Sequence, residues 1–173
     1  TSLFYGCGKL SGNIPIDFLA DSPNLTQVHW MFSDCVNITG PVPSTICAGK
    51  PILRMTGMFR NTKITSAIGT FRDCTSVVEM TPPNPEDNPK HPFQGCSELT
   101  DITECFRGCT SLTNLPSSLT FNESPKLTSI SHLFYNCSSL TGSMPTGMFD
   151  NCSLLTTVNR AFYNCRLTSI SPT

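Results

Sequence analysis

The sequence predicts a repeat solenoid, in which coils of about 28 residues, each made of two half-units, stack along one axis. Three observations lead to this fold class. A tetrad Phe-x-x-Cys recurs along the chain, and Phe106, Phe134 and Phe162 follow one another at intervals of 28 residues. Each tetrad follows a short segment in which apolar residues flank Thr or another polar residue. The residue before the Cys is always Gly, Asn or Asp.

Each half-unit belongs to one of two types that alternate along the chain. The short type has seven residues from its Leu or Ile to its Phe, as from Leu127 to Phe134. The long type takes eight or nine and usually contains a proline, as from Leu140 to Phe149 with Pro145. Nine clear tetrads begin at Phe4, Phe32, Phe59, Phe71, Phe93, Phe106, Phe134, Phe149 and Phe162, and weaker copies begin at Leu19, Ile46 and Phe121.

The segment before each tetrad has the pattern of a short, half-buried strand. In Leu127–Ile130, apolar and polar residues alternate broadly and β-branched residues are frequent. The Phe and Cys that follow are three residues apart, which suits one face of a single helical turn. We therefore expect short parallel β-strands joined through single helical turns, with stacked Phe rings filling the interior.

The residue before the Cys, or before its Thr substitute, is expected to adopt a left-handed backbone conformation. Only Gly, Asn and Asp visit that region at low cost, and a helical turn commonly ends on such a residue. This residue would redirect the chain into the next strand. The predicted positions are Gly6, Asp34, Asn61, Asp73, Gly95, Gly108, Asn136, Asn151 and Asn164.

Eight of the ten cysteines occupy one column of the repeat. The same column also holds Ser22, Gly49, Thr62 and Ser124, which indicates a requirement for a small side chain. We therefore predict a ladder of buried free thiols. Disulfides between neighbouring coils are the alternative: a spacing of roughly 4.8 Å permits them, but ladder side chains run parallel. The predicted ladder comprises Cys7, Cys35, Cys74, Cys96, Cys109, Cys137, Cys152 and Cys165.

The sequence offers little support for a metal site or an enzyme. Cys105 and Cys109, with Cys96 and His91 nearby, allow a zinc site to be drawn, but a second matched pair of ligands is absent. Acidic residues are scattered, whereas glycoside hydrolysis needs paired carboxylates. We expect no catalytic residues, no metal and no cofactor.

The composition and the two ends of the chain limit which partners and which domain organisation are expected. The 173 residues carry a net charge of −1 and only 13% are charged, so binding to nucleic acid is not expected. No run is long and apolar enough to insert into a membrane. Residues 1–173 read as a single solenoid segment of a longer chain, because both ends fall inside a repeat without a polar cap. The proline-rich stretch 81–92 reads as a loop insertion.

The repeat resembles a known family. The runs Leu127–Leu140 and Met55–Asn61 are similar to the BspA-type leucine-rich repeats and to the related repeats of mycoplasma-type bacterial surface lipoproteins. The resemblance covers nearly the whole chain apart from residues 81–91. It implies a right-handed leucine-rich-repeat solenoid that acts in adhesion and recognition on cell surfaces or in virion and fibre proteins. This chain departs from the family in its alternating half-units and its proline-rich loop.

The favoured hypothesis is a non-enzymatic recognition or adhesion module, extracellular or at a cell or virion surface, that binds a protein or glycan through the solenoid face. The alternative is a structural spacer or assembly element of a larger fibre, virion or cell-surface protein. Variable residues after each strand are the candidate contacts, with the single Trp as an aromatic anchor. They are Gln27, His29, Trp30, Arg54, Asp101, Glu104, Ser129, His132, Asn159 and Arg160.

Overall fold

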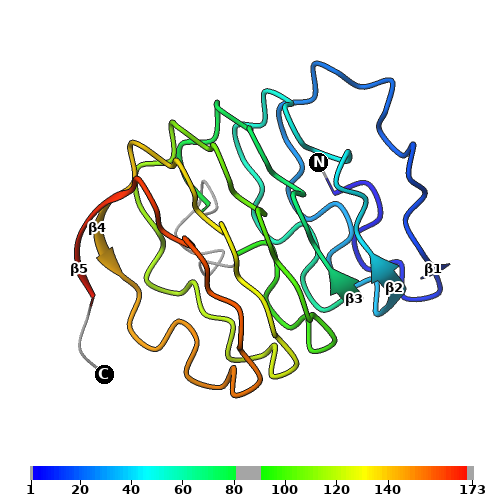
Figure 1. Ribbon diagram of the computed structural model, residues 1–173. Coiled ribbons are helices and arrows are strands. Elements are labelled where there is room, and N and C mark those ends of the chain that lie inside the picture. Colours follow the sequence, from blue (N-terminus) through cyan, green and yellow to red (C-terminus); the bar gives the residue numbers. More distant parts are fainter. Residues whose placement is uncertain (1, 81–90, 171–173) are drawn as a thin grey trace.

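The computed structural model describes residues 2–80 and 91–170, so most of the expected loop at 81–92 lies outside the described residues. The chain winds through successive coils that stack side by side from the N-terminal to the C-terminal end (Figure 1). The expected short parallel strands are present. They are β1 (Ser11–Gly12), β2 (Asn37–Pro41), β3 (Lys63–Ser66), β4 (Thr141–Met144) and β5 (Arg166–Ile170).

Two parallel ladders run along the stack, one for each half-unit. The first ladder contains β1, β2 and β3 and continues through single bridges from Ser66 to Asp101, Ser129 and Thr157. The second ladder begins with the bridge between Gln27 and Arg54 and ends with the pairing of β4 and β5. Each coil therefore contributes one segment to each ladder, as the two-part repeat predicts.

The interior holds two columns of aromatic rings. In one column Phe71, Phe106, Phe134 and Phe162 stack with centroids 5.1–5.5 Å apart. The other column contains Phe4, Phe32, Phe59 and Phe93, at 5.5–5.9 Å. Phe93 lies 6.3 Å from Phe71 and 6.2 Å from Phe106, so the two columns pack against each other. Because each buried ring removes a large apolar surface from water, these columns form the core of the stack.

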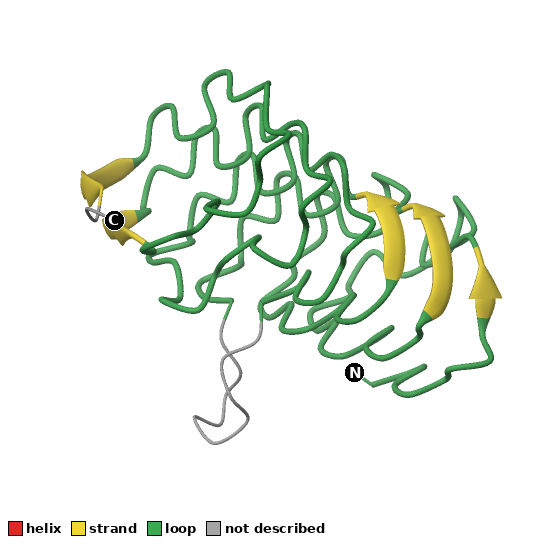
Figure 2. Cartoon of the chain, turned by 90° about the horizontal axis from the view of Figure 1, so that it is seen from below, coloured by secondary structure: helices red, strands yellow, loops and turns green. Residues whose placement is uncertain are grey.

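The prediction of single helical turns was wrong. Among residues 2–80 and 91–170 there is no helix, and tight turns stand in its place (Figure 2). In Phe134–Cys137 the Cys N–H donates to the Phe carbonyl at 3.1 Å, and the third residue, Asn136, has a φ of 60°. A type II β-turn requires a positive φ at this position. Such a residue interrupts the helical hydrogen-bond series, so one residue type both closes the turn and prevents a helix.

The left-handed conformation is found at eight of the nine predicted positions, with φ from 57° to 75°. It directs the backbone N–H along the stack: Asp34 donates to Arg60 O at 2.8 Å and Asn136 to Tyr163 O at 2.9 Å. The prediction was wrong at Asn151, which is not among the residues with positive φ. The N–H of Asn151 donates instead to the Asn122 side chain of the preceding coil, at 3.3 Å, and so does not need the left-handed geometry.

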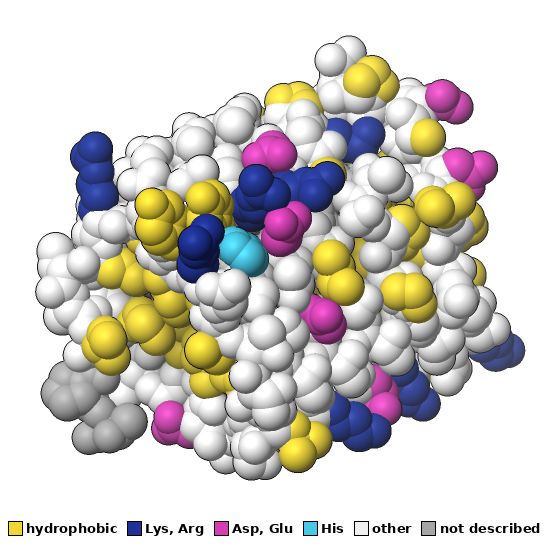
Figure 3. All heavy atoms as spheres, in the orientation of Figure 1, with side chains coloured by type: hydrophobic (Ala, Val, Ile, Leu, Met, Phe, Trp, Pro, Cys, Tyr) yellow, Lys and Arg dark blue, Asp and Glu magenta, His cyan; other side chains and the backbone are white. Residues whose placement is uncertain are grey.

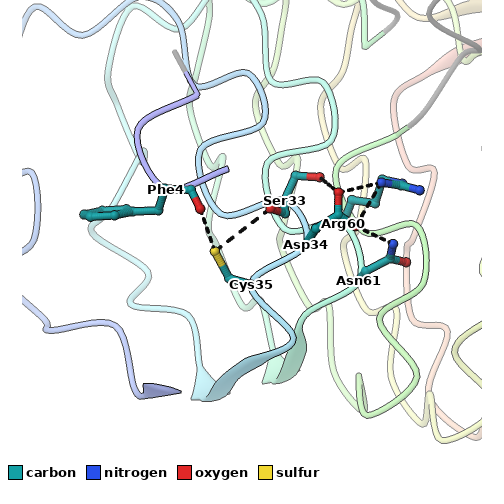
Figure 4. A network of polar contacts seen from close by, with 6 residues as sticks. All are labelled: Phe4, Ser33, Asp34, Cys35, Arg60 and Asn61. Carbon is teal, nitrogen blue, oxygen red and sulfur yellow. Dashed lines mark hydrogen bonds and ion pairs between the residues drawn. The ribbon is translucent and has the colours of Figure 1, made fainter. Parts of the chain in front are cut away.

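Side chains at this turn position also connect neighbouring coils. The Asp34 carboxylate accepts hydrogen bonds from Arg60 Nη1 at 2.8 Å and from Asn61 Nδ2 at 2.6 Å (Figure 4). Asn164 Nδ2 donates to Asn136 Oδ1 at 3.1 Å in the same way. Asn and Asp therefore serve twice at this position, through their backbone conformation and through a side-chain bond to the next coil.

The cysteine column has a function that the small-side-chain interpretation missed. All ten cysteines are free thiols in the structure, but the predicted burial is wrong at Cys7, which is exposed in the first coil of the stack, and Cys165 is only half-buried. Cys109 Sγ donates to Phe71 O at 3.2 Å and Cys137 Sγ to Phe106 O at 3.1 Å, so each of these two thiols bonds the ring residue of the preceding coil. Burial raises the pKa of Cys74 and Cys96 to about 12, which keeps these thiols protonated as donors.

The donor requirement corrects two assignments from the sequence. Gly49, with a φ of 68°, occupies the left-handed position, and Lys50 takes the place in the column, where its Nζ donates to Leu19 O at 3.1 Å. In the same half-unit Cys47 stands at the Phe position in place of Ile46, since its carbonyl accepts the Cys74 thiol at 3.0 Å. What the column shares is a hydrogen-bond donor.

Candidate functional site

The ten predicted contact residues divide into two groups that follow different ladders. Gln27, His29, Trp30 and Arg54 belong to the second ladder, near the N-terminal end of the stack. The other six belong to the first ladder, in three coils nearer the C-terminal end: Asp101, Glu104, Ser129, His132, Asn159 and Arg160. The sequence pattern placed them on one surface, but they form two separate groups.

The N-terminal group is largely engaged in packing. His29 is only 8% exposed, and burial, followed by the charge of Arg54, lowers its pKa. Arg54 pairs with Glu79 at 3.3 Å. Trp30 is half-buried and lies over Gly57, where an added Cβ would stand 2.5 Å from the indole ring. These contacts explain why Gly occupies position 57.

The C-terminal group is part of a larger polar and aromatic surface. An acidic side chain lies at its centre: Glu104 accepts hydrogen bonds from Arg72 Nη1 at 3.1 Å and from Arg107 Nη1 at 3.0 Å. The face shown in Figure 3 carries such a group, with basic side chains beside a histidine and acidic and hydrophobic side chains close by. We call this surface the Arg/Tyr stripe, and it comprises Arg72, Glu104, Arg107, His132, Tyr135, Arg160 and Tyr163.

Aromatic contacts extend the stripe from coil to coil. The Arg107 guanidinium lies over the Tyr135 ring, 5.5 Å from its centroid, and Arg160 lies over Tyr163 at 5.8 Å. The two tyrosine rings stack at 5.1 Å, and the His132 ring packs against Tyr135 at 5.3 Å. Arg160 is exposed and Tyr163 is 55% exposed. The stripe therefore presents Arg and Tyr, the residue types that dominate binding energy at protein interfaces.

Three residues of the stripe adopt a backbone conformation that is costly for their side chains. Glu104, His132 and Arg160 have φ of 56°, 54° and 51°. Each is the third residue of a second tight turn, closed at 3.1 Å between Ile130 O and Leu133 N in the coil of His132. In three other half-units the equivalent left-handed residue is glycine (Gly57, Gly69 and Gly147), and in one it is Trp30. A bulky residue held in this region costs about 1–3 kcal/mol relative to an unstrained one, so the fold itself favours Gly there.

Sequence reasoning missed four residues of the stripe: Arg72, Arg107, Tyr135 and Tyr163. All four directly follow a Phe of the tetrad, in consecutive half-units of the first ladder. The signal was present, because the tetrads of that ladder read Phe-Arg-Asp-Cys, Phe-Arg-Gly-Cys, Phe-Tyr-Asn-Cys and Phe-Tyr-Asn-Cys. Sorting the half-units by ladder before comparing positions would have revealed this run of Arg and Tyr.

A metal centre has no support in the part of the chain that the structure describes. No group of three or more His, Cys, Asp or Glu side chains is arranged there to hold an ion. His91, drawn into the zinc alternative, is buried against Phe121, with ring centroids 5.6 Å apart. Within these same ranges no helix has the length and apolar character needed to cross a membrane.

Comparison with known proteins returned structural similarities only. No protein-family model matches the chain, and no curated protein matches it in sequence. The plant peptide hormone receptor RGFR1 in complex with RGF2 is similar over 93% of this chain, with 17% identity and a TM-score of 0.32. A leucine rich cell surface protein from Faecalibacterium prausnitzii is similar over 92%, with 16% identity and a TM-score of 0.27.

A leucine-rich repeat protein from Bacteroides ovatus is similar over 94% of the chain, with 16% identity and a TM-score of 0.23. The chain spans 35% of the length of the plant receptor and 62% of each bacterial protein. All three of these proteins are therefore longer than this chain.

Proposed function

We propose that this chain is a non-enzymatic recognition module that binds a protein partner through the Arg/Tyr stripe, at a cell surface or outside the cell. One observation carries the proposal: large polar side chains occupy a left-handed position in three consecutive coils where the fold favours Gly. Strain of this kind persists where the side chain itself has a use. A spacer would need only the stacking of coils, and Gly would serve it better at residues 104, 132 and 160.

We also infer that the coils are those of a BspA-type leucine-rich repeat, wound right-handed as parallel β-crossovers usually are. The parallel ladders, the Phe columns and the repeat of about 28 residues support this assignment. In such a stack the surface grows along one axis, which suits an elongated protein segment better than a compact small molecule.

The proposal is tested with a random-peptide display library panned against the wild-type chain. Each enriched peptide is then measured against the triple variant Glu104→Gly, His132→Gly, Arg160→Gly. Each change relieves a left-handed residue, which offsets the loss of the two ion pairs of Glu104, so this variant should fold about as well as the wild type. The matched control is Glu98→Gln with Lys126→Gln, which removes an ion pair at 2.6 Å outside the stripe.

Peptides that bind the wild type and the control but lose the triple variant would support the proposal. If no peptide is enriched, or if the enriched peptides bind all three proteins equally, the stripe is not a protein-binding surface. Circular dichroism and chemical denaturation of each variant verify that a loss of binding is not a loss of folding.

A further inference from the structure

We propose that the partner segment recognised by the Arg/Tyr stripe is an extended acidic peptide with carboxylates at alternating positions. This inference rests on the proposed function and names the chemistry of the partner. It is argued from the charge balance of the stripe, from how its guanidinium groups are held, and from the spacing of the coils.

The stripe contains more guanidinium donors than its own carboxylate uses. Glu104 takes one N–H from Arg72 and one from Arg107. Arg72 Nε also lies 3.9 Å from Asp73. An Arg side chain has five N–H donors, so both residues keep donors for a ligand. Arg160 lies within 4.0 Å of no carboxylate of the described residues and contacts only the Tyr163 ring in the stripe. Planar guanidinium groups with free edges match carboxylates in two-bond geometry.

The guanidinium groups are held in place before any ligand arrives. Glu104 fixes Arg72 and Arg107 from one side, and the Tyr135 ring supports Arg107 from another. Tyr163 supports Arg160 and is itself stacked on Tyr135. A side chain that is already ordered loses less entropy on binding, so such donors contribute more to affinity than free surface arginines would.

The spacing of the stripe fits an extended peptide better than a continuous polyanion. Successive coils are about 5 Å apart here, as the Tyr135–Tyr163 stack at 5.1 Å shows. Alternate side chains of an extended strand are separated by roughly 6.8 Å, so a peptide running obliquely along the stack presents one side chain per coil. Its carboxylates would meet Arg72 and Arg107 and, beyond the coil of Tyr135, which supplies no guanidinium, Arg160. Glu104 lies between Arg72 and Arg107, and Asp73 lies 3.9 Å from Arg72, so both carboxylates would repel a polymer charged at every unit, such as a sulfated polysaccharide.

The test uses three fluorescein-labelled decapeptides, (Glu-Thr)5, (Gln-Thr)5 and (Lys-Thr)5, with heparin as the competing polyanion. Fluorescence anisotropy should show binding of the Glu peptide alone. Arg107→Gln and Arg160→Gln should each weaken that binding about tenfold, because hydrogen bonds to charged groups are lost. Arg107→Lys should recover part of it. Arg54→Gln, on the second ladder, serves as the matched control and should change nothing.

Equal binding of the Glu and Gln peptides, or full binding by Arg160→Gln, would overturn the inference. Heparin binding that depends on Arg107, with no binding of the Glu peptide, would overturn it in favour of a polyanion. The display experiment separates the two levels: enriched peptides that depend on the stripe but lack Asp and Glu refute the acidic ligand and leave the protein-binding function in place. Peptides that ignore the stripe refute both.

Discussion

In six half-units, such as that of Phe134, two tight turns each have a left-handed third residue, and the two turns differ in which residues fill that position. In the turn that begins at the Phe, the residue is Gly, Asn or Asp, as in Gly108 and Asn136. In the preceding turn it is Gly in some half-units and Trp, Glu, His or Arg in others. The backbone demand is the same in both turns, since both send an N–H to the next coil.

This difference between the two turns distinguishes residues that the stack of coils needs from residues that are kept for another reason. Where the position obeys backbone preference, the side chain either is absent or bonds the neighbouring coil, as Asn164 bonds Asn136. Where it opposes backbone preference, the side chain points to another purpose. Trp30 covers Gly57 and thereby packs two coils together, whereas Glu104, His132 and Arg160 lie in the Arg/Tyr stripe.

The largest expected effect is a dependence of stability on pH that comes from one of two equivalent histidines. His91 and His132 occupy the same repeat position, because each stands two residues before a Phe. Burial lowers the pKa of His91 to about 4. Below pH 6.5 the His91 side chain binds a proton in the unfolded chain but not in the folded chain. The free energy of unfolding should therefore fall by roughly 3 kcal/mol as the pH drops from about 6.5 to 4. Urea denaturation across this range measures the loss.

His91→Phe should remove most of that pH dependence, because a second ring keeps the contact with Phe121 without binding a proton. His132→Asn is the control, since it replaces the histidine at the equivalent repeat position and leaves His91 and its contact with Phe121 in place. A residual slope from His29 is expected in both variants. An unchanged slope in His91→Phe would show that His91 is not the group responsible.

The next largest effect is expected from two glycines in the turn that precedes the Phe turn. Gly57→Ala meets both a positive φ and the Trp30 ring, so it should cost about 2 kcal/mol or more. Gly69→Ala has the same backbone conformation, but its nearest neighbour is Ser44 at 3.7 Å, so only the strain should appear, at about 1 kcal/mol. Chemical denaturation gives both values, and equal costs would mean that Trp30 does not press on Gly57.

The smallest expected effects are changes in stability of opposite sign, one for a substitution in the turn before the Phe and one for a substitution in the Phe turn. His132→Gly should stabilise the protein by up to about 1 kcal/mol, because it relieves a left-handed residue. Asn136→Ala should destabilise it by about 1 kcal/mol, since Ala is strained there and the bond from Asn164 is lost. Thermal unfolding of both variants is sufficient. Destabilisation by His132→Gly would mean that the His side chain serves the fold.

The stack could be predicted from the sequence because its positions repeat. The Phe columns recur with one residue type, and the strands and the Phe-turn residues recur with a small set of types, so a single alignment reveals them. The turns in place of helices were missed because Phe and Cys three residues apart fit either conformation. The second left-handed position was hidden by Trp30, Glu104, His132 and Arg160, which are residues that ordinarily avoid a positive φ.

The candidate site was less predictable because its residues do not repeat. Glu104, His132 and Arg160 were expected as contacts, but Arg72, Arg107, Tyr135 and Tyr163 were overlooked. Their neighbourhood depends on which half-units share a ladder, and two consecutive short units at Phe59 and Phe71 disturb the alternation. Only the three-dimensional pairing of segments, such as Ser66 with Asp101, resolves that order.

Because the coils advance regularly, gene duplication can set the length of the proposed binding face. One added repeat would lengthen the face by about 5 Å, judged from the 5.1 Å between Tyr135 and Tyr163, and would leave every existing contact in place. A longer partner segment with more contact residues would then be matched by more coils. The existing coils and the existing part of the partner would not have to change.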